Sequence, residues 1–326
     1  MDAAASSLVP APGLRRTRRL GDRVGDRVLY GLTAGASLLG VLVIAAIAWR
    51  VADGAWPAIR IFHLSFLWHN DWNAVTSRFG ARDLIVGTVV TSFGAILLAA
   101  PLSIAIGLFL SELAPPAVRG PIGTLVELLA AVPSVVVGLW GIYVLAPFMA
   151  AHVQPALADT LGWVPIFGHT VNPAGSGMLT AIVVLTIMTI PITSSICREL
   201  FLGVPSELEE GAIGLGATRW EMVRTVVVPS VRGGIVAAVI LGLGRALGEA
   251  IAVTQVIGNF TPIHLSLFGP GDTIASRIAN QYAGAVTTVQ IASLVYLALI
   301  LLAITFVTNV AAQRVVKRFE LQRTGP

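Results

Sequence analysis

Residues 84–111 read LIVGTVVTSFGAILLAAPLSIAIGLFLS, a run of 28 residues without a charged side chain. A helix needs only about 20 predominantly apolar residues to cross the hydrocarbon core of a bilayer. The rest of the chain has the same character, since 56% of its 326 residues are hydrophobic and only 12% are charged. Typical globular proteins have about 25% charged residues. Lipid is therefore the expected solvent for most of this protein.

Five further apolar runs accompany the first one. Two of them contain charges: one is interrupted by Glu127, and another carries Arg245 and Glu249. Unpaired backbone groups are not tolerated in hydrocarbon, so each run is predicted to be a helix. We predict an all-α polytopic membrane protein with six transmembrane helices, namely an N-terminal helix and a core of five. The five further runs cover residues 28–49, 122–151, 178–197, 233–259 and 291–310.

The cationic side chains predict the orientation of these helices. Fifteen of the 21 Lys and Arg residues lie in the two tails, around Arg119 and between the fourth and fifth runs, whereas five lie in the alternate loops. Because cytoplasmic loops carry the excess of positive charge, both termini are expected in the cytoplasm. The expected parts are a cytoplasmic Arg-rich tail (1–27), a peripheral transmembrane helix (28–50), an extracytoplasmic segment (51–83), a helical body (84–316) that contains a cytoplasmic segment (198–232), and a cytoplasmic tail (317–326).

The cytoplasmic segment between the fourth and fifth runs carries helix signals. Ser206 is followed three residues later by Glu209, which is the spacing of a capping box at the start of a helix. This helix should end near residues 214–216, where glycine can adopt a positive φ. A second helix is expected to run from Thr218 toward the membrane. A short helix at this face is a part that can dock in the groove of a partner protein.

The same segment resembles a known motif. Glu210-Gly211-Ala212, Gly216 and the final Val226-x-Val228-Pro229 have the spacing of the E-A-A-x3-G-x9-I-x-L-P loop of ABC importer permeases. Gly211 replaces the first Ala of that pattern, and the two Val replace Ile and Leu. Three other segments resemble the PstC-type permease of phosphate ABC importers: VPSVVVGLWG (132–141), GLGRALGE (242–249) and TIASRIAN (273–280).

The resemblance implies a type I ABC importer permease in the bacterial plasma (inner) membrane. Its partners would be a PstA-type second permease, two copies of a cytoplasmic ATPase and an extracytoplasmic phosphate-binding protein. ATP and Mg²⁺ would be bound by the ATPase, and no cofactor by this chain. The family's intramembrane charge pair would correspond to Arg245 and Glu249. The ATPase-coupling residues would be Glu209, Glu210, Gly211, Ala212 and Gly216.

The charges within the apolar runs are the candidate pathway residues. The i,i+4 spacing of Arg245 and Glu249 predicts that they lie about 5–6 Å apart on one helix face. Charges at this depth are costly and should not face lipid. The planar fork of Arg suits phosphate oxygens, which favours a role in an anion pathway or gate. A buried structural ion pair is the alternative. Glu127, which is near Arg119 in sequence, and Ser134 are the other two candidates for the pathway.

Several classes of function are excluded or disfavoured by the sequence. A Walker A loop needs a Lys on the phosphates, and Lys317 in the tail is the only Lys, so ATP hydrolysis by a P-loop in this chain is excluded and no enzyme is predicted. The five His and the single Cys197 lack the spacing of metal ligands. No basic soluble domain is present that could bind nucleic acid.

The function predicted from the sequence is that of a translocation-pathway permease in an ATP-driven importer of inorganic phosphate. A permease for another oxyanion, such as molybdate or sulfate, is the nearest alternative. A stand-alone secondary transporter would have no need of an ATPase dock, and an inverted repeat typical of that class is not evident in the sequence. A role in signalling phosphate status through the same assembly stays open.

Overall fold

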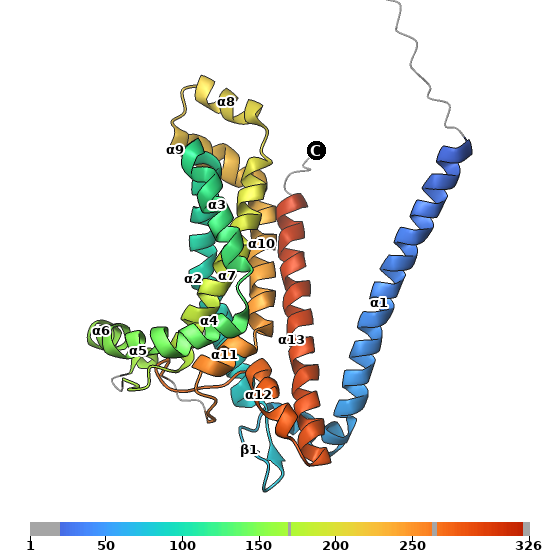
Figure 1. Ribbon diagram of the computed structural model, residues 1–326, viewed down its shortest axis with the longest axis vertical. Coiled ribbons are helices and arrows are strands. Elements are labelled where there is room, and N and C mark those ends of the chain that lie inside the picture. The colour runs from blue at the N-terminus through green and yellow to red at the C-terminus, as the bar shows by residue number, and fades with distance from the viewer. Residues whose placement is uncertain (1–19, 169–170, 263–265, 322–326) are drawn as a thin grey trace, which may run out of the picture. The chain divides into compact units, whose positions relative to one another are not determined.

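The computed structural model describes residues 20–168, 171–262 and 266–321, and most of them are helical (Figure 1). Among these described residues, six helices are long and apolar enough to cross a membrane, which confirms the predicted fold class. The chain divides into two units at Arg50, and we describe each by itself. Arg15, Arg16, Arg18, Arg19 and Arg323, on which part of the charge count rests, lie outside the described residues.

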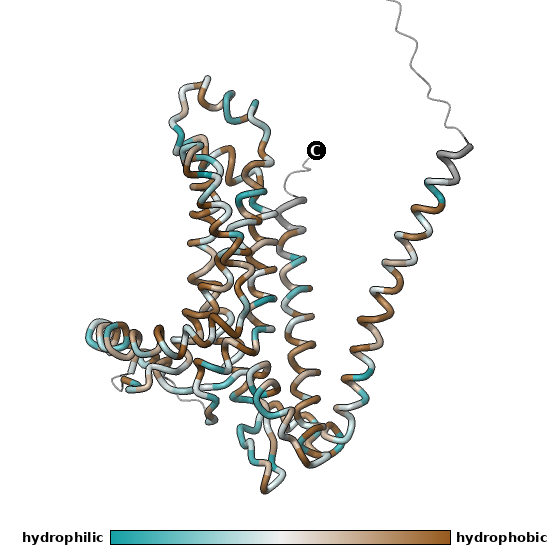
Figure 2. The backbone as a smooth tube through the Cα atoms, in the orientation of Figure 1, coloured by the Kyte–Doolittle hydropathy of each residue, from teal (hydrophilic) through white to brown (hydrophobic). Residues whose placement is uncertain are grey.

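The first unit consists of the helix α1 up to Arg50. Helix α1 begins at Leu20 and ends at Phe62, so its last part belongs to the second unit. Between Val28 and Ile47 its large apolar side chains are exposed, and Figure 2 shows hydrophobic residues along this stretch. A helix with exposed apolar side chains over such a length is suited to lipid rather than to water.

Four long helices form the frame of the second unit: α2 (Arg82–Leu108), α7 (Met178–Leu202), α10 (Val228–Gly248) and α13 (Thr288–Leu321). Small and hydroxyl side chains let α2 and α7 approach closely, as is common between helices in membranes. The hydroxyl of Thr186 donates to the carbonyl of Ala95 at 3.3 Å. A Cβ added to Gly107 would lie 2.9 Å from the Cβ of Cys197, so the two backbones leave no room for a larger residue.

The third predicted span is wrong as a single helix. Helix α3 (Pro116–Ala130) ends before Val132, and a new helix, α4 (Ser134–Trp140), begins after Pro133. Pro133 lacks an amide hydrogen and disfavours helical backbone at Val132. Figure 1 shows α3 beside α2 and α7, while the helix that starts with α4 turns across them. This helix continues through Gly141–Leu145, α5 (Ala146–Phe148) and Met149–Val153 into α6 (Gln154–Leu161).

The fifth predicted span is also interrupted. It was predicted to cover residues 233–259, whereas the observed span begins with α9 (Arg219–Met222) and the π-helical turn Val223–Val227, and its main helix α10 (Val228–Gly248) ends at Gly248. Glu249 follows with φ −71° and ψ 118°, which is extended backbone. A separate short helix, α11 (Ile251–Val256), then starts. Gly244 and Gly248 lower the helix propensity of the last turn of α10, which favours an end at this point.

The two ends of the helix frame carry different elements (Figure 1). One end holds α8 (Ser206–Gly214) and α9. At the opposite end the antiparallel strands β1 (Trp72–Asn73) and β2 (Arg78–Phe79) lie near α12 (Ile274–Gln281). There the ring of Phe66 stacks on that of Tyr296 at 4.6 Å, so the segment after α1 is packed on α13. The remaining short elements are His63–Leu67, the π-helical turn Phe109–Leu113, Pro165–Phe167 and Tyr282–Gly284.

Candidate functional site

The helix predicted in the cytoplasmic segment is present as α8, with the turn expected at its end. The amide of Ala217 donates to the carbonyl of Ala212 at 3.1 Å, and Gly216 has φ +89°. Glycine adopts this conformation without the steric penalty of a Cβ. The predicted capping box at Ser206 is wrong, because no side chain caps α8, which follows Pro205. The capping box forms instead between Thr218 and Glu221, at the start of α9.

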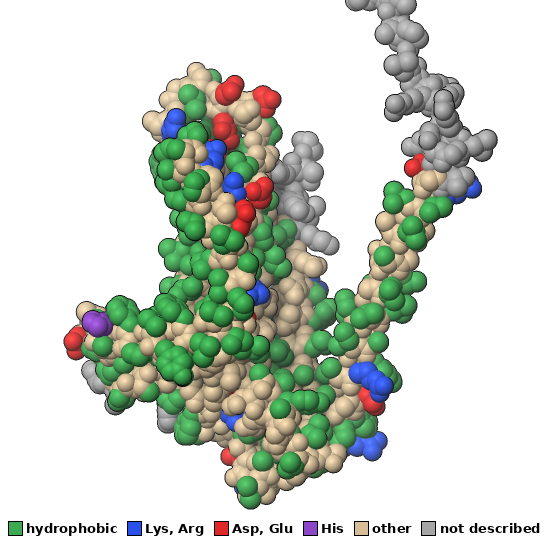
Figure 3. Space-filling model, viewed as in Figure 1, with side chains coloured by type: hydrophobic (Ala, Val, Ile, Leu, Met, Phe, Trp, Pro, Cys, Tyr) green, Lys and Arg blue, Asp and Glu red, His purple; other side chains and the backbone are tan. Residues whose placement is uncertain are grey.

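Helix α8 presents two different faces. Glu209 and Ala212 are half-buried, and Ala212 packs on a core formed by α7, α9 and α10. Burial raises the pKa of Glu209, and the negative charges of Glu112 and Glu210 add to this effect. On the outward side Glu210 is exposed, and the side chain of Leu215 is 93% exposed. Charged side chains gather over this end of the molecule (Figure 3), so α8 offers a mixed apolar and acidic surface.

Arg245 occupies the last turn of α10 and has an exposed side chain. It lines a hollow of about 600 Å³ between α7, α10 and α13. The hollow lies within the part of the bundle formed by three of the candidate membrane spans. Its lining consists of Ile192, Ile240, Leu241, Gly244, Arg245, Gly248, Glu249, Thr305 and Asn309. A second, narrow cavity also includes Arg245 in its lining, together with residues of α3, α4 and α7 and with Val132 between α3 and α4.

Arg245 and Glu249 share the hollow without forming an ion pair. Because α10 ends at Gly248, the two residues are not on one continuous helix face, and the predicted i,i+4 geometry is wrong. Instead, Oε1 of Glu249 accepts a hydrogen bond from the amide of Ala252 at 3.3 Å, at the start of α11. Among the residues that the structure describes, no carboxylate pairs with Arg245. Its guanidinium charge is therefore not neutralised within the described part of the chain.

The two other pathway candidates lie elsewhere. Glu127 projects from α3 and pairs with Arg198 of α7, with 3.4 Å between Nη1 and Oε1. It does not pair with Arg119, which donates to the carbonyl of Ala114. Ser134 is the first residue of α4 and half-buried, and it is not among the residues that line the two cavities at Arg245. The structure thus brings together Arg245 and Glu249 and leaves Glu127 and Ser134 apart from the hollow.

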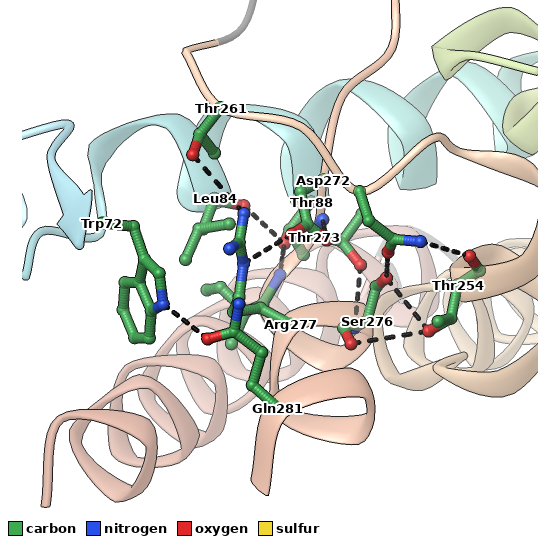
Figure 4. A network of polar contacts seen from close by, with 12 residues as sticks. Trp72, Leu84, Thr88, Thr254, Thr261, Asp272, Thr273, Ser276, Arg277 and Gln281 are labelled. Atoms are coloured by element: carbon green, nitrogen blue, oxygen red, sulfur yellow. Dashed lines mark hydrogen bonds and ion pairs between the residues drawn. The ribbon is translucent and has the colours of Figure 1, made fainter. Parts of the chain in front are cut away.

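A second polar site was not predicted from the sequence, although Arg277 is one of the five cationic residues counted in the alternate loops. Arg277 of α12 pairs with Asp272, with 2.6 Å between Nε and Oδ2, and their side chains are only 7% and 1% exposed. Trp72 lies 5.5 Å below the guanidinium and donates to Gln281 at 2.6 Å (Figure 4). Burial raises the pKa of Asp272, and the charge of Arg277 opposes this effect. The sequence offered one signal for this site: Arg277 lies in the segment 273–280, which resembles the PstC-type permease.

This network fixes α12 at the end of the bundle. The amide of Ile274 donates to the hydroxyl of Thr88 on α2 at 2.9 Å. Ser276 and Thr254 share a hydrogen bond of 3.0 Å that connects α12 with α11. Because Asn259 accepts from Ser276 at 2.9 Å as well, the turn after α11 is held by the same group of side chains. The short helix that Glu249 caps is therefore anchored to α12 and, through it, to α2.

Comparison with known proteins identifies relatives that cover most of this chain. Residues 103–321 match the family described as "Binding-protein-dependent transport system inner membrane component". The phosphate transport system permease protein PstC of Mesorhizobium japonicum is 45% identical over 92% of this chain and 92% of its own length. PstC of Pasteurella multocida is 42% identical over 93% of this chain and 95% of its own length.

Solved structures show the same fold at lower identity. A bacterial alginate ABC transporter chain aligns with a TM-score of 0.58 and 18% identity over 92% of this chain and 99% of its own length. A chain of the MetNI methionine ABC transporter, in an inward-facing conformation, aligns with a TM-score of 0.53 and 20% identity over 72% and 96%. The extent of the family match and the identity to the two PstC proteins leave no other assignment: the chain is a multi-pass membrane protein that belongs to the family of binding-protein-dependent transport system inner membrane components, within its PstC group.

Proposed function

We propose that this chain is the permease subunit of an ATP-driven importer of inorganic phosphate in the bacterial plasma membrane. The phosphate transport named for its PstC relatives supports the substrate. The observation that carries the proposal is Arg245, a cation that lines a hollow among membrane-spanning helices without a carboxylate partner in the described residues. Arg presents planar donors that match the oxygens of phosphate, and it stays charged at any physiological pH.

In this proposal Arg245 binds the anion transiently while the anion crosses the membrane. An isolated cation at this depth is costly, so it attracts an anion, and the apolar side chains of Ile192 and Ile240 in the lining strengthen this attraction by lowering the local dielectric. Glu249 lines the same hollow, and Oε1 of its carboxylate accepts a hydrogen bond from the amide of Ala252 at 3.3 Å. The charges of Arg245 and Glu249, the two ionisable residues in the lining of the hollow, sum to zero.

The proposed assembly contains a PstA-type second permease, two ATPase subunits and an extracytoplasmic phosphate-binding protein. Helix α8 would dock in the ATPase, with both termini of the chain on the same cytoplasmic side. Leu208 and Ile213 of α8 and Leu215 directly after it are all exposed beside the acidic residues of this helix. A group of exposed apolar side chains next to polar ones is suited to a partner groove, which supports this role. ATP would be hydrolysed by the partner subunits, and this chain would transmit the motion.

Reconstitution tests the proposal directly. The complex purified through this chain is placed in proteoliposomes with the phosphate-binding protein outside, and initial uptake of radiolabelled phosphate is measured with and without ATP. Wild type should import phosphate only with ATP, Arg245→Leu should assemble and be inactive, and Arg245→Lys should retain little uptake. Normal uptake by Arg245→Leu would disprove the pathway role. ATP-driven uptake of sulfate or molybdate in place of phosphate would show that the assigned anion is wrong.

A further inference from the structure

The hollow at Arg245 contains two polar side chains that the pathway proposal does not use. Thr305 and Asn309 project from α13, four residues apart and so on one face of that helix. Both lie in the part of α13 that can span the membrane. Within the described residues neither side chain forms a hydrogen bond, although Thr side chains elsewhere in the bundle bond to backbone carbonyls. Both residues are half-buried, and polar side chains that face a hollow between membrane-spanning helices indicate a ligand or a water-filled path.

The four polar groups of the hollow differ in what they can offer a ligand. Arg245 only donates hydrogen bonds, Asn309 and Thr305 can both donate and accept, and the carboxylate of Glu249 only accepts. Oε1 of Glu249 already receives the amide of Ala252, whereas its second oxygen has no hydrogen-bond partner in the described structure. A ligand that fills this hollow therefore meets a cation, two neutral groups and one free anionic acceptor.

These four polar groups should bind protonated and unprotonated oxyanions with different strength. Sulfate carries no proton at neutral pH, so its oxygens can accept from Arg245 and Asn309 but are repelled by the carboxylate of Glu249. Phosphate and arsenate carry at least one proton at neutral pH, and their O–H can donate to that carboxylate. A hydrogen bond with a charged partner is about twice as strong as a neutral one, and an acceptor that finds no donor excludes the wrong ligand.

We infer that this hollow is a binding site for an oxyanion that carries a proton, with Asn309 and Thr305 of α13 as ligands beside Arg245 and with Glu249 as the acceptor that selects the protonated anion. The inference rests on the proposed function, because it uses the same hollow. It adds a selectivity step inside the membrane to the selection that a binding protein makes outside it.

A purely structural role of Glu249 can be separated from this one. The cap on α11 needs only an oxygen that accepts from Ala252, and Gln supplies such an oxygen with nearly the same shape. Glu249→Gln therefore keeps the cap, removes the negative charge and adds a donor that an unprotonated oxyanion can use. If Glu249 is only a cap, this exchange leaves the choice of anion unchanged. If Glu249 selects the anion, the exchange should strengthen the binding of sulfate relative to that of phosphate.

The experiment uses the membrane complex purified through this chain in lipid nanodiscs, without the binding protein. Binding of inorganic phosphate is measured by the broadening of its phosphorus NMR line, and arsenate and sulfate are added as competitors. In wild type, arsenate should compete as well as unlabelled phosphate, and sulfate should be weaker by about tenfold or more. In Glu249→Gln, sulfate should come within about threefold of arsenate.

Variants of α13 test the other two ligands. Asn309→Leu should weaken phosphate binding about tenfold, and Asn309→Asp should weaken it further by adding a negative charge. Thr308→Val is the matched control, since Thr308 is the neighbouring residue and is not among those that line the hollow; binding should be unchanged. Equal competition by sulfate and arsenate in wild type, or an unchanged preference in Glu249→Gln, would overturn the inference. ATP-driven uptake by the same preparation reports the proposed function separately, so either can fail alone.

Discussion

Two glycines of the α8 segment provide a matched pair that tests how its shape depends on single residues. No heavy atom outside the local backbone lies within 4 Å of a Cβ built on Gly211 or on Gly216, so steric contact does not distinguish them. Gly211 is inside the helix, whereas Gly216 has φ +89°. Ala at residue 211 should stabilise α8 by about 1 kcal/mol through helix propensity. Ala at residue 216 should cost about 1–2 kcal/mol, because a side chain disfavours left-handed backbone.

The two substitutions should therefore differ by about 2–3 kcal/mol, which corresponds to roughly 30- to 150-fold in the equilibrium constant for local opening. Hydrogen exchange of peptides that cover α8 and the following turn, in the purified complex, measures that constant. Gly211→Ala should slow exchange and keep ATP-driven uptake. Gly216→Ala should accelerate exchange and lower uptake, and Gly216→Val should do so more strongly. If both Ala variants shift exchange in the same direction, backbone conformation does not control this segment.

Three further predictions concern charges. Since Arg245 and Glu249 form no ion pair, the coupling energy between Arg245→Leu and Glu249→Leu should stay well below the about 3–5 kcal/mol lost when a buried ion pair is broken; a coupling of that size in the thermal unfolding of the complex would contradict the geometry. Asp272→Leu or Arg277→Met alone should cost about 3–5 kcal/mol by leaving a buried charge, while both together should cost much less; equal losses in all three variants would refute this. The pKa of Glu209 is raised in the folded state, so its contribution to stability is present below the ordinary value of 4.5 and is lost as the pH rises through the raised value. Glu209→Gln should therefore make the free energy of unfolding less dependent on pH in this range. An unchanged pH dependence would contradict the raised pKa.

The six spans could be predicted from the sequence because lipid selects composition, and composition is visible without a structure. The breaks at Pro133 and Glu249 could not be located in the same way. An apolar run looks alike whether it forms one helix or two, and four prolines lie inside the predicted spans, at residues 101, 133, 147 and 191. Only Pro133 separates two helices, since Pro101 and Pro191 lie within α2 and α7 and Pro147 within α5.

The residue types of the candidate site could be predicted from the sequence, but the side chains with which they interact could not. Ser206 with Glu209 and Thr218 with Glu221 have the same spacing, yet only the second pair forms a capping box. Arg245 and Glu249 were chosen because charges in apolar runs are rare, and their separation depends on where α10 ends. Asp272 and Arg277 form their pair because α12 begins between them, a start that the sequence did not reveal. Local spacing constrains pairs within one helix and says little about pairs across a helix boundary.

The π-helical turn Val223–Val227 sets the direction in which α9 faces relative to α10. The amide of Val228 bonds to the carbonyl of Val223, five residues back, so this turn holds one residue more than an α-helical turn. Each residue of an α-helix advances the chain by about 100° around the axis. A relative that lacked one residue here would keep α10 in place but carry α9, with the exposed ring of Trp220, about a quarter of a circle away. The extra residue in this turn therefore fixes the rotation of α9 about the helix axis relative to α10. If a relative lacks that residue, a sequence alignment alone does not show the rotation, and side chains of α9 inferred from the alignment would point in the wrong direction.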